Sequence, residues 1–228
     1  MPIVPAFLPA PPPVPALPSY RPFGGRLCLD FVNTVNGRLT NGPEDLLAEA
    51  GALVAWGQQL GLLEAAAAVR IGAAWRTTDA VAAARLAQAV ALRETLYAVF
   101  AAIATGGVPA RADLDTLSDA YRAALASARL VAAGDGGPWR WEPHRAAAEP
   151  ADLGWLVWPV TRSAIDLLTS DDLAGLKRCA GADRGCAGLF VDETRNGIRR
   201  WCSMDGCGSR AKMRRLYARR RADRGASA

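Results

Sequence analysis

The residues of this chain best suited to chemistry are four cysteines close together near its C-terminal end. Cys179 and Cys186 form one pair and Cys202 and Cys207 a second, with six, fifteen and four residues between successive cysteines. Two such pairs, joined by a loop long enough to fold back, can place four thiolates around one tetrahedral ion, as in structural zinc sites. The spacing therefore predicts one structural Zn²⁺ bound by these four side chains.

The rest of the chain gives no sign of export or of a membrane partner. The first 22 residues contain nine prolines and no basic start, which does not fit a secretory signal peptide. No uninterrupted apolar run approaches the roughly 20 residues that a membrane-spanning helix needs. We therefore expect a cytoplasmic chain whose paired cysteines bind metal rather than form disulfides. The fifth cysteine, Cys28, lies among apolar residues and is expected to be a small buried side chain.

Charge is divided unevenly along the chain. Residues 177–228 carry a net charge of +9, whereas residues 1–176 carry −4. Lys177 and Lys212 are the only lysines, so the basic end is almost wholly guanidinium, which suits bidentate contacts to phosphate and guanine. This asymmetry indicates a polyanion-binding end on a mildly acidic body.

The segment SRAKMRRLYARRR predicts a basic helix over 209–221 with Ser209 near its N-cap. Met213, Leu216 and Tyr217 share one side, and we expect this stripe to dock the helix on the zinc core. No acidic residue lies between Asp205 and Asp223, so the remaining faces can track phosphates or enter a major groove. The helical residues expected to contact nucleic acid are Arg210, Lys212, Arg214, Arg215 and Arg219.

No catalytic constellation is evident, and we expect that the protein is not an enzyme. His144 is the sole histidine, and neither HExxH nor GxSxG occurs. The GDGGP turn at 134–138 lacks the Lys-Ser/Thr of a phosphate-binding loop and predicts a hairpin or loop.

A small-molecule site would leave no short motif, and one candidate set follows the first apolar segment. Asp30, Asn33 and Thr34 lie at its end, and Arg93 lies on a long predicted helix. The alternative is structural: Asn33 and Thr34 would cap a strand and turn, and Arg93 would pair with a carboxylate of the body.

The elements predict a helix-dominated α+β body with a small antiparallel sheet. Period-two or apolar patterns predict strands at 27–35, 139–143 and 153–158. Helices are predicted as a short pair within 46–61, over 78–104 with Thr78 and Asp79 as caps, from Asp113 to Leu125, from Pro159 to Leu168, and briefly after Ser170. We divide the chain into a disordered proline-rich tail (1–22), a body (23–176), a zinc module ending in the basic helix (177–222) and a flexible end (223–228).

The zinc module resembles the CGNR zinc finger family. The resemblance rests on a cysteine pair, the Phe-Xaa-Asp segment at 190–192, the RRWC block at 199–202, and CGSR at 207–210 followed by a basic helix. The upstream chain resembles the ABATE domain of the same family through LCLDFVNTV, LVAW, ALRETLYAVF and PVTRSAIDLLTSDD, in the expected order.

The resemblance implies a stress-induced bacterial transcription regulator, with a sensing body and a DNA-binding finger. It matches the four cysteines to the zinc ligands, and Arg199, Arg200, Arg210 and Lys212 to the basic positions around them. Ser209 replaces the namesake Asn of the family, which would alter specificity if that Asn contacts a base.

Together these features predict a zinc-dependent regulator that binds double-stranded DNA in the bacterial cytoplasm, associated with the nucleoid. The body would bind a small-molecule effector or form a homodimer. Two alternatives stay open: an RNA-binding protein, and a small-molecule-binding protein or enzyme with a basic localising tail.

Overall fold

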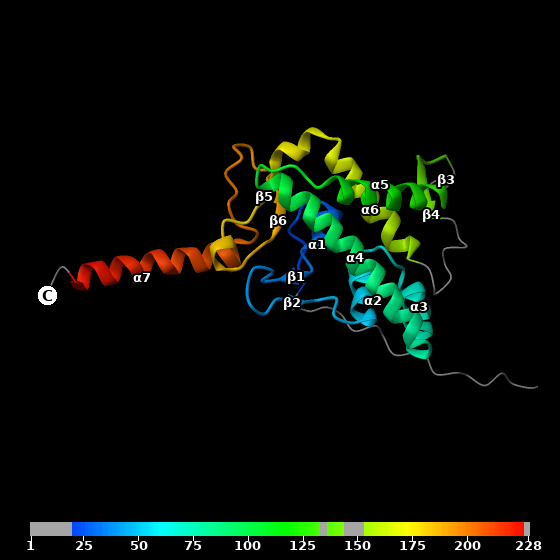
Figure 1. The fold of residues 1–228 in the computed structure, drawn as a ribbon, viewed down its shortest axis with the longest axis horizontal. Coiled ribbons are helices and arrows are strands. Elements are labelled where there is room, and N and C mark those ends of the chain that lie inside the picture. The colour runs from blue at the N-terminus through cyan, green and yellow to red at the C-terminus, as the bar shows by residue number, and fades with distance from the viewer. Residues whose placement is uncertain (1–19, 133–135, 144–152, 226–228) are drawn as a thin grey trace, which may run out of the picture.

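The computed structural model describes residues 20–132, 136–143 and 153–225 of the chain (Figure 1). Its α-helices are α1 (Leu27–Val32), α2 (Ala50–Gln59), α3 (Ala65–Thr77), α4 (Asp79–Ala104), α5 (Arg111–Ala126), α6 (Gly154–Leu168) and α7 (Ser209–Gly225). Short helical turns are η2 (Asp171–Gly175), η3 (Ala182–Arg184) and the π-helical η4 (Met204–Gly208).

Strands form three antiparallel pairs within these residues. They are β1 (Val35–Asn36) with β2 (Glu44–Asp45), β3 (Ala128–Ala132) with β4 (Trp139–Pro143), and β5 (Leu176–Arg178) with β6 (Leu189–Val191). The predicted helix-dominated α+β class, with small antiparallel sheets, is therefore confirmed.

Helix α4 runs through the middle of the body and contacts α1, α2, α3, α5, α6 and the β5–β6 pair (Figure 1). Leu92, Leu96 and Phe100 are buried on it. Among the described helices it alone is long and apolar enough to cross a membrane by length and composition. Its packing on many sides, together with two charged side chains held in ion pairs at Arg93 and Glu94, makes it the core helix of the body.

The main hydrophobic core extends into the C-terminal module. Leu176 of β5 and Leu189 and Val191 of β6 belong to the same buried cluster as the helices of the body. A second, small cluster contains Cys179, Phe190, Cys202 and Cys207, with Phe23 and Trp201 packed against it. The zinc module is thus built onto the body by a shared core.

Helix α7 projects away from the rest of the molecule (Figure 1). Met213, Leu216 and Tyr217 are 44%, 38% and 57% exposed, so the prediction that this stripe docks on the zinc core is wrong. Ala211, which 3.6 residues per turn puts on the opposite side of the helix, is buried instead. A small side chain lets the first turn pack closely, and the larger ones are left to solvent.

The strand predicted at 27–35 is wrong because residues 27–32 form α1, and of the predicted range Val35 alone lies in a strand, β1. Cys28 to Val32 are all buried, so the period-two pattern does not separate an inner from an outer face. The Asp30 carboxylate accepts hydrogen bonds from the backbone N–H groups of Phe23 (2.9 Å) and Gly24 (2.8 Å), which fixes the chain entering the helix. Burial raises the pKa of Asp30, and these two bonds partly offset that effect. Cys28 is fully buried, as predicted.

The strand predicted at 153–158 is also wrong, whereas the one at 139–143 is confirmed as β4. Residues 154–158 are the first turns of α6, and Pro159 lies inside that helix rather than at its start. Trp155, Leu156 and Trp158 are buried at helical spacing. The partner of β4 is β3, which directly follows α5 and which the sequence did not indicate.

Other boundaries differ modestly from the predictions. The segment 46–61 contains one helix, α2, rather than a pair, and α3 was missed. Asp113 lies in the first turn of α5 rather than at its cap. In the first turn its negative charge still interacts favourably with the helix dipole. The Thr78 side chain makes no capping bond to α4.

Parts of the predictions fall outside the described residues: the tail over 1–19, the loop with His144, residues 134–135 of the GDGGP turn and the end at 226–228. Tyr20, placed in the tail by the prediction, is buried. It packs edge-on against Trp56, and its hydroxyl donates to the carbonyl of Asp30 at 2.9 Å.

Gly57 on α2 allows close packing against α6, and substituting it tests this contact. A Cβ at Gly57 would lie 2.3 Å from Cζ3 of Trp155, which demands a shift of a buried indole. We expect Gly57→Ala to lower the free energy of unfolding by about 1–3 kcal/mol, as overpacking does. Gly51→Ala on the same helix meets no atom within 4 Å and should be neutral or slightly stabilising. Urea unfolding of both variants measures the difference, and equal stabilities would contradict the packing.

Candidate zinc centre and nucleic-acid interface

The four cysteine sulfurs converge on one point between β5, η3 and η4. All four Sγ atoms lie within 4.8 Å of one another, and Cys202 Sγ is 3.7 Å from both Cys186 Sγ and Cys207 Sγ. A tetrahedral zinc site with Zn–S bonds of about 2.3 Å requires sulfurs about 3.8 Å apart. The cluster therefore has the size and the ligand set for one Zn²⁺. Cys179, Cys202 and Cys207 are buried, which suits a structural rather than a catalytic ion.

Several donors already point at these sulfurs. Cys179 Sγ accepts from the backbone N–H groups of Gly181 and Cys202, both at 3.4 Å, and Nη2 of Arg210 donates to Cys207 Sγ at 3.3 Å. Hydrogen bonds from the thiols of Cys186 and Cys202, together with these N–H groups, lower the pKa of Cys179. Because four thiolates around Zn²⁺ leave a net charge of −2, such donors stabilise the loaded site.

Asp192 organises the loop that leads from β6 to Cys202. Its carboxylate accepts from Lys177 Nζ (2.6 Å), from the hydroxyl (2.6 Å) and backbone N–H (3.0 Å) of Thr194, and from the backbone N–H of Arg199 (2.9 Å). The bond from Lys177 is the main reason that the pKa of Asp192 is held well below its usual range. The loop is therefore closed around one carboxylate before the chain reaches the third zinc ligand.

The Arg199 side chain makes its hydrogen bonds within the protein. Its guanidinium donates to the carbonyls of Phe23 (2.9 Å), Cys202 (2.8 Å) and Trp201 (3.2 Å), and it lies 4.1 Å above the ring of Phe190. These contacts join the N-terminal segment of the body to the third zinc ligand. The donors predicted for nucleic acid at this position already have partners.

Asn33 joins the body to β6. It follows α1 as its C-cap, and its side chain donates to the carbonyl of Leu189 (2.7 Å) and accepts from the N–H of the same residue (2.9 Å). The Asn33 side-chain amide thus bonds to both backbone groups of Leu189, as a residue on a neighbouring strand would. Asn33 also lines a cavity of about 550 Å³ between the β1–β2 pair and the zinc module, whose wall includes Arg21, Arg184 and Arg210.

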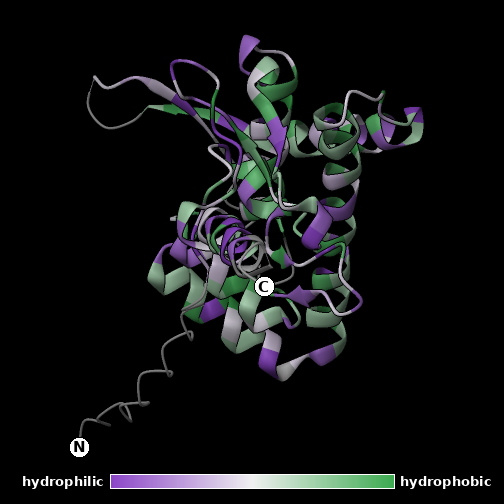
Figure 2. Cartoon of the chain, turned by 90° about the vertical axis from the view of Figure 1, so that its left-hand side faces the viewer, coloured by the Kyte–Doolittle hydropathy of each residue, from purple (hydrophilic) through white to green (hydrophobic). Residues whose placement is uncertain are grey.

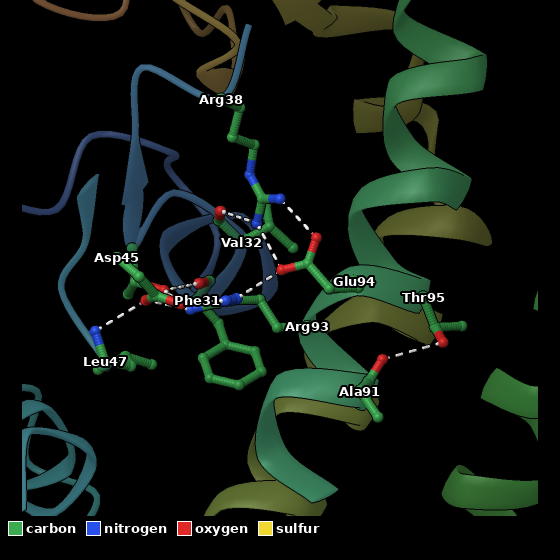
Figure 3. Close-up of polar contacts among 10 residues, drawn as sticks. Phe31, Val32, Arg38, Asp45, Leu47, Ala91, Arg93, Glu94 and Thr95 are labelled. Atoms are coloured by element: carbon green, nitrogen blue, oxygen red, sulfur yellow. Dashed lines mark hydrogen bonds and ion pairs between the residues drawn. The ribbon is translucent and has the colours of Figure 1, made fainter. Parts of the chain in front are cut away.

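Thr34 and Arg93 belong to a network that fixes the β1–β2 pair (Figure 3). Arg93, which is 2% exposed, makes two bonds of 2.7 Å to the carboxylate of Asp45, one of 3.2 Å to Thr34 Oγ1 and one of 2.9 Å to Glu94. Glu94 also pairs with Arg38. Burial acts to raise the pKa of Asp45, but Arg93 outweighs it, so the pKa is lowered. Its contribution to stability is therefore present at neutral pH and lost as the pH falls toward its folded-state pKa.

The four residues considered for a small-molecule site are held by protein partners. Asp30, Asn33, Thr34 and Arg93 are all buried, and each has the protein partners described above. Only Asn33 borders the cavity beside the zinc module. The carboxylate considered as a partner for Arg93 is Asp45.

Helix α7 points toward the viewer in Figure 2 and is coloured mainly as hydrophilic. Lys212, Arg215 and Arg219 are exposed and Arg214 is half-buried. Before the helix, Arg200 is exposed and lies 5.6 Å from the ring centre of Trp201. Arg210 is also exposed, but its guanidinium donates a hydrogen bond to Cys207 Sγ.

Ser209 does not cap α7. It has helical backbone angles and is the first helical residue, and its hydroxyl donates to the carbonyl of Met204 at 3.0 Å. The capping side chain is Ser203, whose Oγ accepts from the N–H of Gly206 at 3.1 Å. The prediction placed the cap too late because α7 is preceded by the continuous π-helical turn η4, which carries Cys207.

Arg199 and Arg215 provide a matched test of which arginines hold the fold. Both substitutions, Arg199→Gln and Arg215→Gln, remove one charge. We expect Arg199→Gln to lower the free energy of unfolding of the zinc-loaded protein by about 2 kcal/mol, since it leaves several buried carbonyls without a charged donor. Arg215→Gln should change it by less than about 0.5 kcal/mol. Denaturant unfolding checks both, and a wild-type stability for Arg199→Gln would disprove the structural role.

Comparisons with known proteins agree with this geometry. Residues 25–171 match the model of the ABATE family, described as "Putative stress-induced transcription regulator", and residues 176–220 match the CGNR zinc finger. Neither description names an enzyme. No curated protein matches the chain. The match over 25–171 covers more than half of the residues, and the second match contains all four cysteines, so the chain belongs to the ABATE family and ends in a CGNR zinc finger that binds one structural zinc ion.

Proposed function

We propose that the protein is a regulator of transcription that binds double-stranded DNA through α7 and its zinc-bound base. The observation that carries this is a helix projecting from the molecule on which Lys212, Arg215 and Arg219 are exposed to solvent. No acidic residue lies between Asp205 and Asp223, so residues 209–222 of the helix carry positive charge with no carboxylate among them. Such a surface releases counterions when it meets a phosphate backbone.

Zinc gives this helix a fixed direction. Cys207 lies in η4, which is the element that α7 chiefly contacts, and η4 continues into α7 without a break. Binding of the metal by Cys207 therefore holds the first turn of the helix against the body. A helix of about 10–12 Å diameter fits a B-DNA major groove about 12 Å wide. The exposed apolar residues Met213, Leu216 and Tyr217 suit contacts with thymine methyl groups there.

The proposed contact set is smaller than the sequence suggests. Lys212, Arg214, Arg215 and Arg219 on α7, with Arg200 before it, supply the contacts. Arg210 can contribute while it supports Cys207, and Arg199 is committed to the fold. Phosphate contacts supply affinity and position, and a few side chains at base edges supply specificity.

The body is proposed to sense an effector and to pair with a second copy in the cytoplasm. One short helix reads few base pairs, so pairing two copies would extend the recognised site. The β3–β4 pair exposes apolar side chains, with Leu130 at 50% and Trp139 at 70%, and offers a surface for this pairing.

DNA binding should depend steeply on salt and on α7. The logarithm of the binding constant should fall linearly with that of salt concentration, with a slope of about −0.9 for each phosphate neutralised. Arg215→Gln should weaken binding and reduce the slope by about one. Arg111→Gln, an exposed site on α5 in the body, removes the same charge and should leave both unchanged. Fluorescence anisotropy with labelled duplex measures the two quantities, and a salt-independent affinity would contradict the proposal.

Selection from random duplexes identifies the sequence and tests the role of zinc. The zinc-loaded protein should enrich a sequence, whereas the Cys202→Ser variant and the chelated protein should not, because both lose the base of α7. Absence of enrichment at low and moderate salt would exclude a sequence-specific DNA regulator. Preferential binding of structured RNA in the same assay would favour the RNA alternative.

Pairing through the body can be measured independently of DNA. If the β3–β4 surface forms the dimer, Trp139→Ser should convert a dimer to a monomer in analytical ultracentrifugation, because an exposed aromatic side chain supplies much of the apolar area. A wild-type protein that sediments as a monomer at micromolar concentration would remove dimerisation from the proposal.

A further inference from the structure

A groove of about 600 Å³ lies between α4, α5 and α6, away from the zinc module. Its walls are mainly small or apolar, with Ala91 on α4, Ala120, Ala123 and Ala124 on α5, and Val157 on α6. Alanines at facing positions of α4 and α5 leave space that leucines would fill. The volume lies in the range of roughly 300–1,000 Å³ found for small-molecule sites.

Trp158 provides a fixed aromatic surface in this groove. It is 5% exposed, and Tyr121 stacks on it with ring centres 6.0 Å apart and planes 9° apart. Trp141 of β4 contacts it from a tilted position at 6.1 Å. An indole held in this way can contact a flat apolar ligand at little cost in side-chain entropy.

Arg85 supplies the charge of the groove. Its Nη1 donates to Gln88 Oε1 at 2.8 Å, which orients the guanidinium, while its Nε is buried and has no hydrogen-bond partner in the described part of the chain. A buried donor without a partner costs free energy that an acceptor would recover. No Asp or Glu is among the residues that line the groove, so Arg85 leaves it with a charge of +1.

The hydroxyl groups that line the groove already donate hydrogen bonds within the protein. Thr95, Thr116 and Ser127 each donate to a carbonyl of their own helix, at Ala91, Ala112 and Ala123 respectively. Besides the side-chain amide of Gln88, whose Oε1 accepts the bond from Arg85, the polar group of the groove that faces a ligand is therefore the Arg85 guanidinium.

We propose that this groove is the effector site of the protein and that it binds a small organic acid with a flat, apolar body and one anionic group. The body of the ligand contacts Trp158 and the alanines of α5, and its anionic group bonds to Arg85. The effector role rests on the regulatory function proposed above, whereas binding of the acid is a property of the body alone.

The position of the groove gives binding a route to the zinc module. Ala91 and Thr95 lie on the side of α4 that faces away from Asp45 and Arg38, whereas Arg93 and Glu94 hold the β1–β2 pair on the other side (Figure 3). The loop between β1 and β2 in turn bonds to the zinc module, since the N–H of Leu39 donates to the carbonyl of Gly185 at 3.1 Å. A ligand that separates α4 from α5 therefore acts on a helix tied to the zinc module.

Two fluorescent probes that differ in one charge test the site in the full-length zinc-loaded protein without DNA. They are 8-anilinonaphthalene-1-sulfonate and its neutral analogue N-phenyl-1-naphthylamine. We expect saturable binding of both at one site. Arg85→Gln should weaken the sulfonate about tenfold and leave the neutral probe unchanged, since it removes a charge-assisted bond. Ala123→Leu should weaken both about tenfold by filling the groove.

Matched controls separate the groove from other surfaces. Ala126→Leu, on α5 outside the groove, and Arg215→Gln on the basic helix should bind both probes as the wild type does. The proposal is overturned if the wild type shows no saturable binding, if Ala123→Leu binds both probes normally, or if Arg85→Gln affects the two probes equally. The probe experiment contains no DNA, so a failure of the DNA-binding proposal would not change its outcome. Likewise, a failure to bind the probes would not contradict DNA binding by α7.

Discussion

The structure depends on the seam between α1 and β6, where one asparagine side chain takes the place of a strand. Asn33 satisfies both backbone groups of Leu189, and Val191 donates to the carbonyl of Gly24 two residues further along β6. These bonds set the position of β6, whose Phe190 packs among the zinc cysteines. Arg199 closes the same seam from the other side through Phe23. Zinc binding and folding of the body are therefore coupled, because β6 belongs to both cores.

Coupling of this kind makes a small zinc module useful to a regulator. The β1–β2 loop approaches the zinc module closely at Gly185, which has a φ of +84° and where a Cβ would lie 2.1 Å from Thr40. On its other side, the β1–β2 pair is fixed to α4 through Arg93 and Asp45. Because the β1–β2 loop contacts both α4 and the zinc module directly, a displacement of α4 would be passed to the zinc module and so to the start of α7. In the proposed regulator, a signal from the groove would pass through these packed contacts.

The sequence could predict features that depend on residue type and spacing, and it could not predict those that depend on tertiary partners. The four zinc ligands follow from spacing alone, and the basic character of α7 follows from charge. Residues 27–35 alternate as a strand does, yet residues 27–32 form a helix that is buried on nearly all sides and whose entry is fixed by the bonds to Asp30. The structural role of Arg199 could not be predicted from the sequence. An arginine next to other basic residues gives no sequence signal that its guanidinium bonds to backbone carbonyls. The structural alternative for Asn33 was closer to the truth than a site, but its partner, 156 residues away, carries no local signal.

The residues that carry the resemblance to the CGNR zinc finger mainly hold the fold in this chain. Phe190 and Asp192 build the loop before Cys202, Arg199 closes the seam, and Ser209 anchors the start of α7 to Met204. An asparagine at that last position could make the same bond through its side-chain amide, so serine can preserve the turn. Residues shared across a family because they hold the zinc site do not distinguish one DNA sequence from another. In the proposed complex, sequence preference would therefore come from α7 beyond its first turn, where Arg215 and Arg219 are exposed.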